Sequence, residues 1–255
     1  MGRHIRRALL GGLVLIGLLY GQGANAQEKK VENPLSYGFE FNQDSFFGSF
    51  PKVFGNYKLR EDFSLAFIAT YWSIGSTPWS QIDLGFNKTL FDKRLTITPF
   101  LGWTNGSYQS SRSFFGAPAP PRAFESVVPA VYIDWYDGLL EGEFYMGYYK
   151  ATRSSGFDSG ANFDRATGGA GTVDYLFWWA YGGVQVHEHL SLGAHYEEFL
   201  STRDSAVGAH GTSLYRWGGP YVELKLASGT TFRVTTGHDF ASNDDFFKLR
   251  FAKTF

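Results

Sequence analysis

The chain has 255 residues, with 23 basic and 24 acidic side chains, a formal net charge of −1 and no cysteine. This balance argues against a basic nucleic-acid-binding surface, and the lack of cysteine excludes a disulfide framework. Aromatic residues make up 18% of the chain, and after the first apolar run no stretch approaches the ~20 apolar residues of a membrane helix.

The first 26 residues predict a secretory signal peptide. A cationic segment (1–7) precedes an apolar run (8–20), and Ala24-Asn25-Ala26 supplies the small-x-small pattern of a cleavage site. The apolar run is short for a helical span and a cleavage site follows it, which argues against an uncleaved anchor. We therefore expect cleavage after Ala26 and a polar leader at 27–34.

Segments of alternating apolar and polar residues recur from residue 35 to the end of the chain. Their lengths are near the ~9–11 residues that a tilted membrane-spanning strand needs. We predict an all-β fold over 35–255, a transmembrane antiparallel up-and-down β-barrel of about 12 strands. The predicted strands are 35–43, 47–59, 63–72, 80–90, 95–105, 126–136, 139–150, 172–186, 190–200, 214–227, 230–240 and 246–255.

The connections between these strands alternate in length. Asp137-Gly138 is a favoured two-residue hairpin signal. An even strand number would put both ends of the barrel domain on the side of the short turns. The short connections are 60–62, 91–94, 137–138, 187–189 and 228–229, and those on the other side are 44–46, 73–79, 105–125, 151–171, 201–213 and 241–245.

The last predicted strand places Phe247, Leu249, Phe251 and Phe255 on one face. This strand resembles the terminal strand of Gram-negative outer-membrane β-barrels of the porin-like kind. The signal peptide and the asymmetry of the loops add to the resemblance. The resemblance implies a bacterial outer-membrane location, a periplasmic leader, and contact with outer-membrane lipids and lipopolysaccharide. It also implies recognition by the barrel assembly machinery through the strand that ends at Phe255. The oligomeric state stays open.

The two faces of each predicted strand differ in polarity, as Ile82 and Leu84 differ from Gln81 and Asp83. A charge on the lipid face costs about 2–4 kcal/mol near the bilayer midplane, so we assign the charged positions to the interior. The predicted pore-lining residues are Glu40, Lys52, Asp83, Asp134, Glu141, Glu143, His195, Glu197, Glu223, Lys225, Arg233, Asp239, Lys248 and Arg250.

These interior charges allow two interpretations. They could pair across the lumen and fill it, or line a water-filled passage that favours polar or zwitterionic solutes. A barrel of about twelve strands has a diameter between that of filled eight-stranded barrels and that of open porins. Five aromatic residues could also face inward, where they would form an aromatic track along a channel or pack a crowded lumen: Tyr132, Tyr136, Tyr215, Trp217 and Tyr221. For Tyr215 and Trp217, which lie near a loop, an interfacial girdle is a further alternative.

Two short patterns are candidate sites of chemistry. His187-x-His189 beside Glu188 has no third ligand at convincing spacing, so we expect no metal and no cofactor. His189-x-Ser191 is similar to the His-x-Ser of outer-membrane lipid A deacylases, with Glu197 or Glu198 as a third member. Leu192 stands where that family has Asn, and the pair begins at a short turn, away from the outer leaflet. We therefore expect no enzyme.

The sequence thus predicts a passive outer-membrane channel for small polar solutes. A closed structural or adhesive barrel that acts through its outer loops is the alternative, and an outer-membrane lipid hydrolase is a third hypothesis.

Overall fold

The computed structural model describes residues 33–74, 77–106, 108–109, 122–152, 172–204, 211–226 and 228–255. The predicted signal peptide, most of the predicted leader and most of the two longest predicted loops lie outside these residues. By contact, residues 1–33 and 34–255 form separate units, and the strands belong to the second. No helix among the described residues has the length and apolar character needed to cross a membrane.

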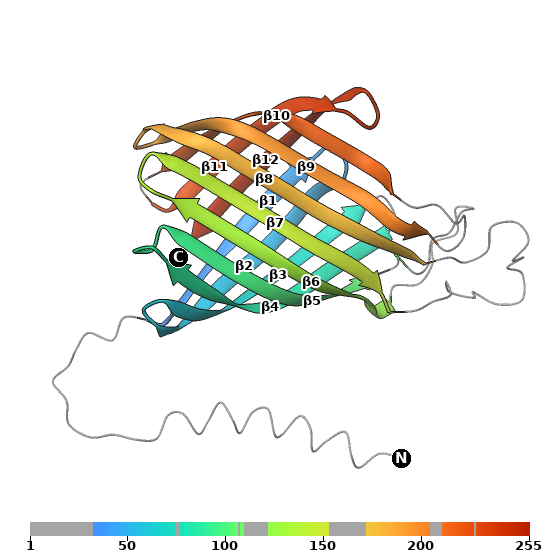
Figure 1. The fold of residues 1–255 in the computed structure, drawn as a ribbon, viewed down its shortest axis with the longest axis horizontal. Coiled ribbons are helices and arrows are strands. Elements are labelled where there is room, and N and C mark those ends of the chain that lie inside the picture. The colour runs from blue at the N-terminus through green and yellow to red at the C-terminus, as the bar shows by residue number, and fades with distance from the viewer. Residues whose placement is uncertain are drawn as a thin grey trace, which may run out of the picture. The chain divides into compact units, whose positions relative to one another are not determined.

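Twelve strands form one closed antiparallel sheet (Figure 1). Each strand pairs with its neighbours in sequence, and the last pairs with the first, so the sheet has no open edge. This confirms the predicted fold class. The strands are β1 (Leu35–Asp44), β2 (Gly48–Arg60), β3 (Phe63–Ile74), β4 (Thr77–Leu90), β5 (Leu95–Gly106), β6 (Arg122–Tyr136), β7 (Leu140–Ala151), β8 (Val173–His187), β9 (Leu190–Asp204), β10 (Thr212–Leu226), β11 (Thr230–Asp239) and β12 (Asp244–Thr254).

The seam between β1 and β12 runs in register from Gly38 opposite Thr254 to Asp44 opposite Lys248. The backbone N–H of Thr254 donates to Gly229 O in the β10–β11 turn at 3.1 Å. Both ends of the barrel therefore lie on the side of the short turns, as the even strand number predicts.

Three strands extend beyond their predicted limits by three or more residues, all next to the long connections. β4 begins at Thr77, β6 begins at Arg122 and β9 continues to Asp204. Polar residues interrupt the apolar alternation in these stretches, but the backbone ladder to the neighbouring strand continues. Side-chain pattern therefore underestimates strand length where a strand leaves the apolar band.

The short turns follow local backbone chemistry. Gly138 has a φ of 95°, which glycine adopts without strain. The Asp137 carboxylate accepts N–H groups from Leu139 at 3.1 Å and Leu140 at 2.8 Å. These two hydrogen bonds hold the pKa of Asp137 below its usual range because they stabilise the ionised form.

The outer face of the barrel is apolar. Large apolar side chains at alternate strand positions are exposed, for example Leu84 and Phe86 of β4, or Val222 and Leu224 of β10. The residues between them point inward, where Asp83 and Glu223 are buried. The alternation is that of a barrel in lipid, with an apolar outer band and a polar interior.

This band gives a depth-dependent prediction. Leu84→Arg, at mid-strand in β4, should destabilise the folded barrel by about 2–4 kcal/mol, since the charge is placed near the bilayer midplane. Leu226→Arg, at the turn end of β10, should cost only about 0–1 kcal/mol. The two leucines are similarly exposed, at 53% and 58%. Urea unfolding in lipid vesicles measures the difference, and equal costs at the two positions would contradict a membrane-spanning arrangement.

Candidate functional site

The interior of the barrel is the candidate site, and most predicted pore-lining residues border one of two cavities that the described residues form there. These are Glu40, Lys52, Asp134, Glu141, Glu143, Glu197, Glu223, Lys225, Arg233, Lys248 and Arg250. Asp83, His195 and Asp239 are buried but line neither cavity. A role for any of these residues in lining a conducting pore stays a prediction.

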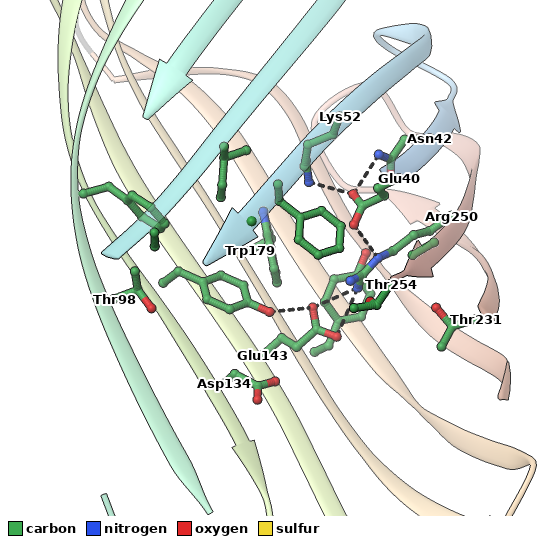
Figure 2. A pocket seen from close by; sticks show the side chains of 18 of the residues that line it. Glu40, Asn42, Lys52, Thr98, Asp134, Glu143, Trp179, Thr231, Arg250 and Thr254 are labelled. Carbon is green, nitrogen blue, oxygen red and sulfur yellow. Dashed lines mark hydrogen bonds and ion pairs between the residues drawn. The ribbon is translucent and has the colours of Figure 1, made fainter. Parts of the chain in front are cut away.

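Six of these side chains form one ion-pair chain across the lumen. Figure 2 shows the part of it made by Lys52, Glu40, Arg250 and Glu143. Glu40 lies 2.6 Å from the Lys52 ammonium and 2.9 Å from Arg250 Nε. Glu143 of β7 lies 2.9 Å from Arg250 Nη1 and 2.6 Å from Arg233 Nη2. β7 and β12 are five strands apart in the barrel, so the Arg250–Glu143 pair crosses the lumen. In order, the ion-pair chain is Lys52, Glu40, Arg250, Glu143, Arg233 and Glu223.

Two further ion pairs flank the ion-pair chain. Near the short turns, Lys225 lies 2.5 Å from Glu141, which also accepts hydrogen bonds from the hydroxyls of Tyr221 and Ser191. Nearer the loop end, Lys248 pairs with Glu197. The charges therefore pair across and along the lumen, as the first of the two sequence interpretations expects.

The lumen is nevertheless not full. A cavity of about 620 Å³ extends from Phe50 and Trp72 near the loop end to Thr231 and Thr254 at the short-turn end. A second cavity of about 200 Å³ adjoins it and shares Asp134 as a lining residue. The interpretation as a water-filled passage therefore also has a physical basis.

The space exists because one wall carries short or neutral side chains. Of the residues that β2–β5 contribute to the larger cavity, only Lys52 is charged. Ala66 and Thr98 are small, and the Thr98 hydroxyl donates to Asn87 Oδ1 at 2.6 Å. Asn87 in turn donates to Asn56 Oδ1 at 2.7 Å. The cavity thus lies between an Asn/Thr wall and the ion-pair chain.

An aromatic layer fills the loop end of the lumen. It consists of Phe46, Phe47, Phe50, Trp72, Trp79, Tyr108, Tyr149, Tyr175, Phe177, Phe199, Tyr215, Trp217 and Phe246. Phe47, in the β1–β2 turn, places its ring centroid 6.0 Å from that of Trp72 on β3 and 5.8 Å from that of Phe199 on β9. Tyr108 similarly joins Trp79 to Phe199. Ring contacts among the described residues therefore span the barrel from wall to wall.

The aromatic layer corrects one sequence interpretation. Tyr215 and Trp217 are buried within it, 4.1 Å apart between ring centroids, so the girdle placement is wrong. Tyr132 lines the larger cavity, whereas Tyr136 lines the smaller one at the short-turn end, where its ring is partly exposed and its hydroxyl donates to Gln185. With Tyr221 bonded to Glu141, the five rings are scattered and form no continuous track.

The Asp239 carboxylate accepts hydrogen bonds from its neighbours at the β11–β12 turn. It ends β11, and its Oδ1 accepts N–H groups from Arg216 and Ala241, each at 2.9 Å. Its Oδ2 accepts the Ser242 hydroxyl at 2.8 Å. The carboxylate thus holds the β11–β12 turn together.

The two candidate sites of chemistry are not assembled. His189 lies in the turn before β9 with its ring exposed, and the Ser191 hydroxyl donates instead to Glu141 at 3.0 Å. His187 and His189 have their ring centroids 5.7 Å apart. Among the described residues, no three His, Cys, Asp or Glu side chains are grouped so as to hold a metal ion.

Comparison of sequences gives a family. The family of unknown function DUF6733 matches residues 6–255, nearly the whole chain. The chain belongs to this family. No curated protein matches this DUF6733 chain.

Solved structures show what the fold of this DUF6733 chain is similar to. The COG4313 outer membrane channel from Pseudomonas putida F1 is 11% identical, with a TM-score of 0.53 over 92% of this chain and 100% of that one. A KdgM porin is 10% identical, with a TM-score of 0.49 over 86% of this chain and 99% of that one. At this identity the likeness concerns the fold alone, which is that of bacterial outer-membrane barrels.

Sequence reasoning on this DUF6733 chain missed the aromatic layer. The signal was present, because Trp72, Tyr149 and Phe199 occupy the inward phase of their strands near the loop end. The sequence alone places aromatic residues at strand ends in interfacial girdles. The face of the strand on which an aromatic residue lies, rather than its position along the strand, decides whether it belongs to the aromatic layer or to a girdle.

Proposed function

We propose that this chain is an outer-membrane channel for small polar solutes, closed at its loop end by the aromatic layer in the conformation described. The observation that carries the proposal is the cavity of about 620 Å³ inside the barrel. Protein interiors are close-packed and seldom leave voids much larger than a water molecule. A barrel with a purely structural role has no need of so large an internal space.

The lining supports transport rather than a chemical step. Asn87 and Thr98 offer amide and hydroxyl groups on one side, and the ion-pair chain offers charged groups on the other. Such groups can replace the water around a polar solute during passage. The proposal requires no cofactor.

Planar-bilayer recording tests the proposal. Because the aromatic layer spans the lumen, the folded wild-type protein should give brief, infrequent single-channel steps above the detergent-only baseline. Folding is checked first by the difference in gel migration before and after boiling. Silence over many insertions, both of wild type and of a variant with an opened aromatic layer, would contradict the proposal.

A closed structural or adhesive barrel is the second candidate. It is favoured by the aromatic layer together with the ion-pair chain, both of which obstruct the lumen. In that case the outer loops would carry the activity, and the same recordings would stay silent. Conductance therefore separates the two candidates directly.

The proposal includes the route to the membrane. Export with cleavage after Ala26 predicts a mature N-terminus at Gln27, which N-terminal sequencing checks. The outer face of β12 carries Phe247 and Phe251, and we include in the proposal its recognition by the barrel assembly machinery. Lipid and lipopolysaccharide would then surround the exposed apolar band.

A further inference from the structure

We infer that the lumen selects cationic solutes, in particular small organic amines, through Asp134 and Asp44, two carboxylates that form no ion pair with any residue the structure describes. The inference rests on the proposed function and adds the charge class of its solute. It starts from the imbalance of charge around the two cavities. They are lined by seven carboxylates and five basic side chains.

Each of the five basic side chains is already paired. Lys52, Arg250 and Arg233 belong to the ion-pair chain, Lys225 pairs with Glu141, and Lys248 pairs with Glu197. An entering anion therefore meets cations whose charge is compensated. A cation meets the two carboxylates that remain.

Asp134 lies toward the short-turn end and borders both cavities. It is opposite Thr96 on β5 and Glu143 on β7. In Figure 2 it stands below Glu143 and apart from the ion-pair chain. Among the described residues, its carboxylate forms no hydrogen bond and no ion pair within contact distance. Its charge is thus available to a solute entering from the short-turn end.

Asp44 lies at the other end of the larger cavity, against the aromatic layer. It is only 3% exposed. Its Oδ1 accepts the backbone N–H groups of Phe46 at 2.9 Å and Phe47 at 2.5 Å, whereas its buried Oδ2 has no hydrogen-bond partner in the part of the chain that the structure describes. Lys248, its neighbour on β12, bonds to Glu197 instead. A buried carboxylate oxygen without a donor favours a ligand that supplies one.

The surroundings of Asp44 specify the kind of cation. Phe47, Phe50 and Trp72 line the same end of the cavity. Aromatic faces attract alkylammonium groups, and a carboxylate beside them neutralises the charge. A small amine with an apolar part matches this end better than a fully hydrated metal ion.

A single-cysteine experiment tests the inference without requiring conduction. The chain has no native cysteine, so Thr96→Cys gives one thiol, whose Cβ should lie within about 5.5 Å of that of Asp134 across the strand pair. Its rates of modification by a cationic and an anionic methanethiosulfonate of similar size are compared in detergent. Their ratio is divided by the ratio for a small free thiol. Asp92→Asn, in the exposed β4–β5 turn, is the matched control because it removes one acidic charge outside the cavities.

We expect a cation-to-anion ratio about tenfold above that of the free thiol, as one nearby charge at intermediate dielectric gives. Asp134→Asn should lower the ratio about fivefold, and Asp92→Asn by less than about twofold, since exposed charges are screened. The double variant Asp44→Asn/Asp134→Asn leaves equal numbers of lining acids and bases, and should bring the ratio close to that of the free thiol.

An unreactive thiol, a ratio near one in the wild-type background, or equal effects of Asp134→Asn and Asp92→Asn would overturn the inference. A cation-preferring cavity in a barrel that never conducts would overturn the channel proposal and leave the charge preference standing. A conducting barrel without the preference would do the reverse.

Discussion

Phe47→Ala is expected to convert rare, brief openings into steady single-channel steps of several-fold higher conductance. Phe47 is 3% exposed and joins β3 to β9 and β10 through ring contacts with Trp72, Phe199 and Tyr215. It lies in a turn rather than on a strand. Removing its ring therefore opens the centre of the aromatic layer without disturbing the backbone ladder.

The turn itself should persist in this variant. Asp44 accepts the backbone N–H at position 47, which alanine retains. Loss of the buried ring should lower the free energy of unfolding by about 3 kcal/mol. Phe41→Ala, on the outer face of β1, is the control and should leave conductance unchanged. A folded Phe47→Ala barrel with wild-type conductance would show that the aromatic layer is not what closes the lumen.

Glu143→Gln is expected to destabilise the barrel by about 3 kcal/mol, because removing one partner of a buried ion pair leaves uncompensated charge. Glu143 is the member of the ion-pair chain that contacts two guanidinium groups, those of Arg233 and Arg250. Both arginines stay in the lumen after the substitution. The neutral amide can accept a hydrogen bond but cannot balance their charge.

The control for this substitution is Glu61→Gln. Glu61 lies 3.3 Å from Lys93, with both side chains largely exposed. An exposed pair of this kind contributes about 0–1 kcal/mol. Urea titration followed by gel migration without boiling measures both variants. Similar midpoints for Glu143→Gln and Glu61→Gln would mean that the ion-pair chain does not hold the opposite walls together.

The period-two pattern was sufficient to locate the strands, although not their ends at the long connections, because a barrel strand has one face in lipid and one in the lumen. In β4, the alternation of Ile82, Leu84 and Phe86 with Gln81 and Asp83 fixes which side chains point outward. The short turns add the strand order, since each connects antiparallel neighbours. Fold class and inward charges therefore follow from local sequence.

The partners of the inward charges do not follow from it. Alternation shows that Arg250 and Glu143 both face inward, but their contact across five strands depends on the stagger and tilt of the closed barrel. The inward position of Phe47 depends on the conformation of the β1–β2 turn, which Asp44 fixes through backbone hydrogen bonds. Both features are set by tertiary geometry rather than by local pattern.

The most direct test is an accessibility scan along β4, by single spin-labelled cysteines at successive positions from 82 to 87 in lipid vesicles. If the outer face of the barrel contacts hydrocarbon, oxygen should reach labels at Ile82, Leu84 and Phe86 best. A water-soluble nickel reagent should favour the alternate positions. Equal access of the nickel reagent along the whole strand, or the opposite phase, would contradict the account.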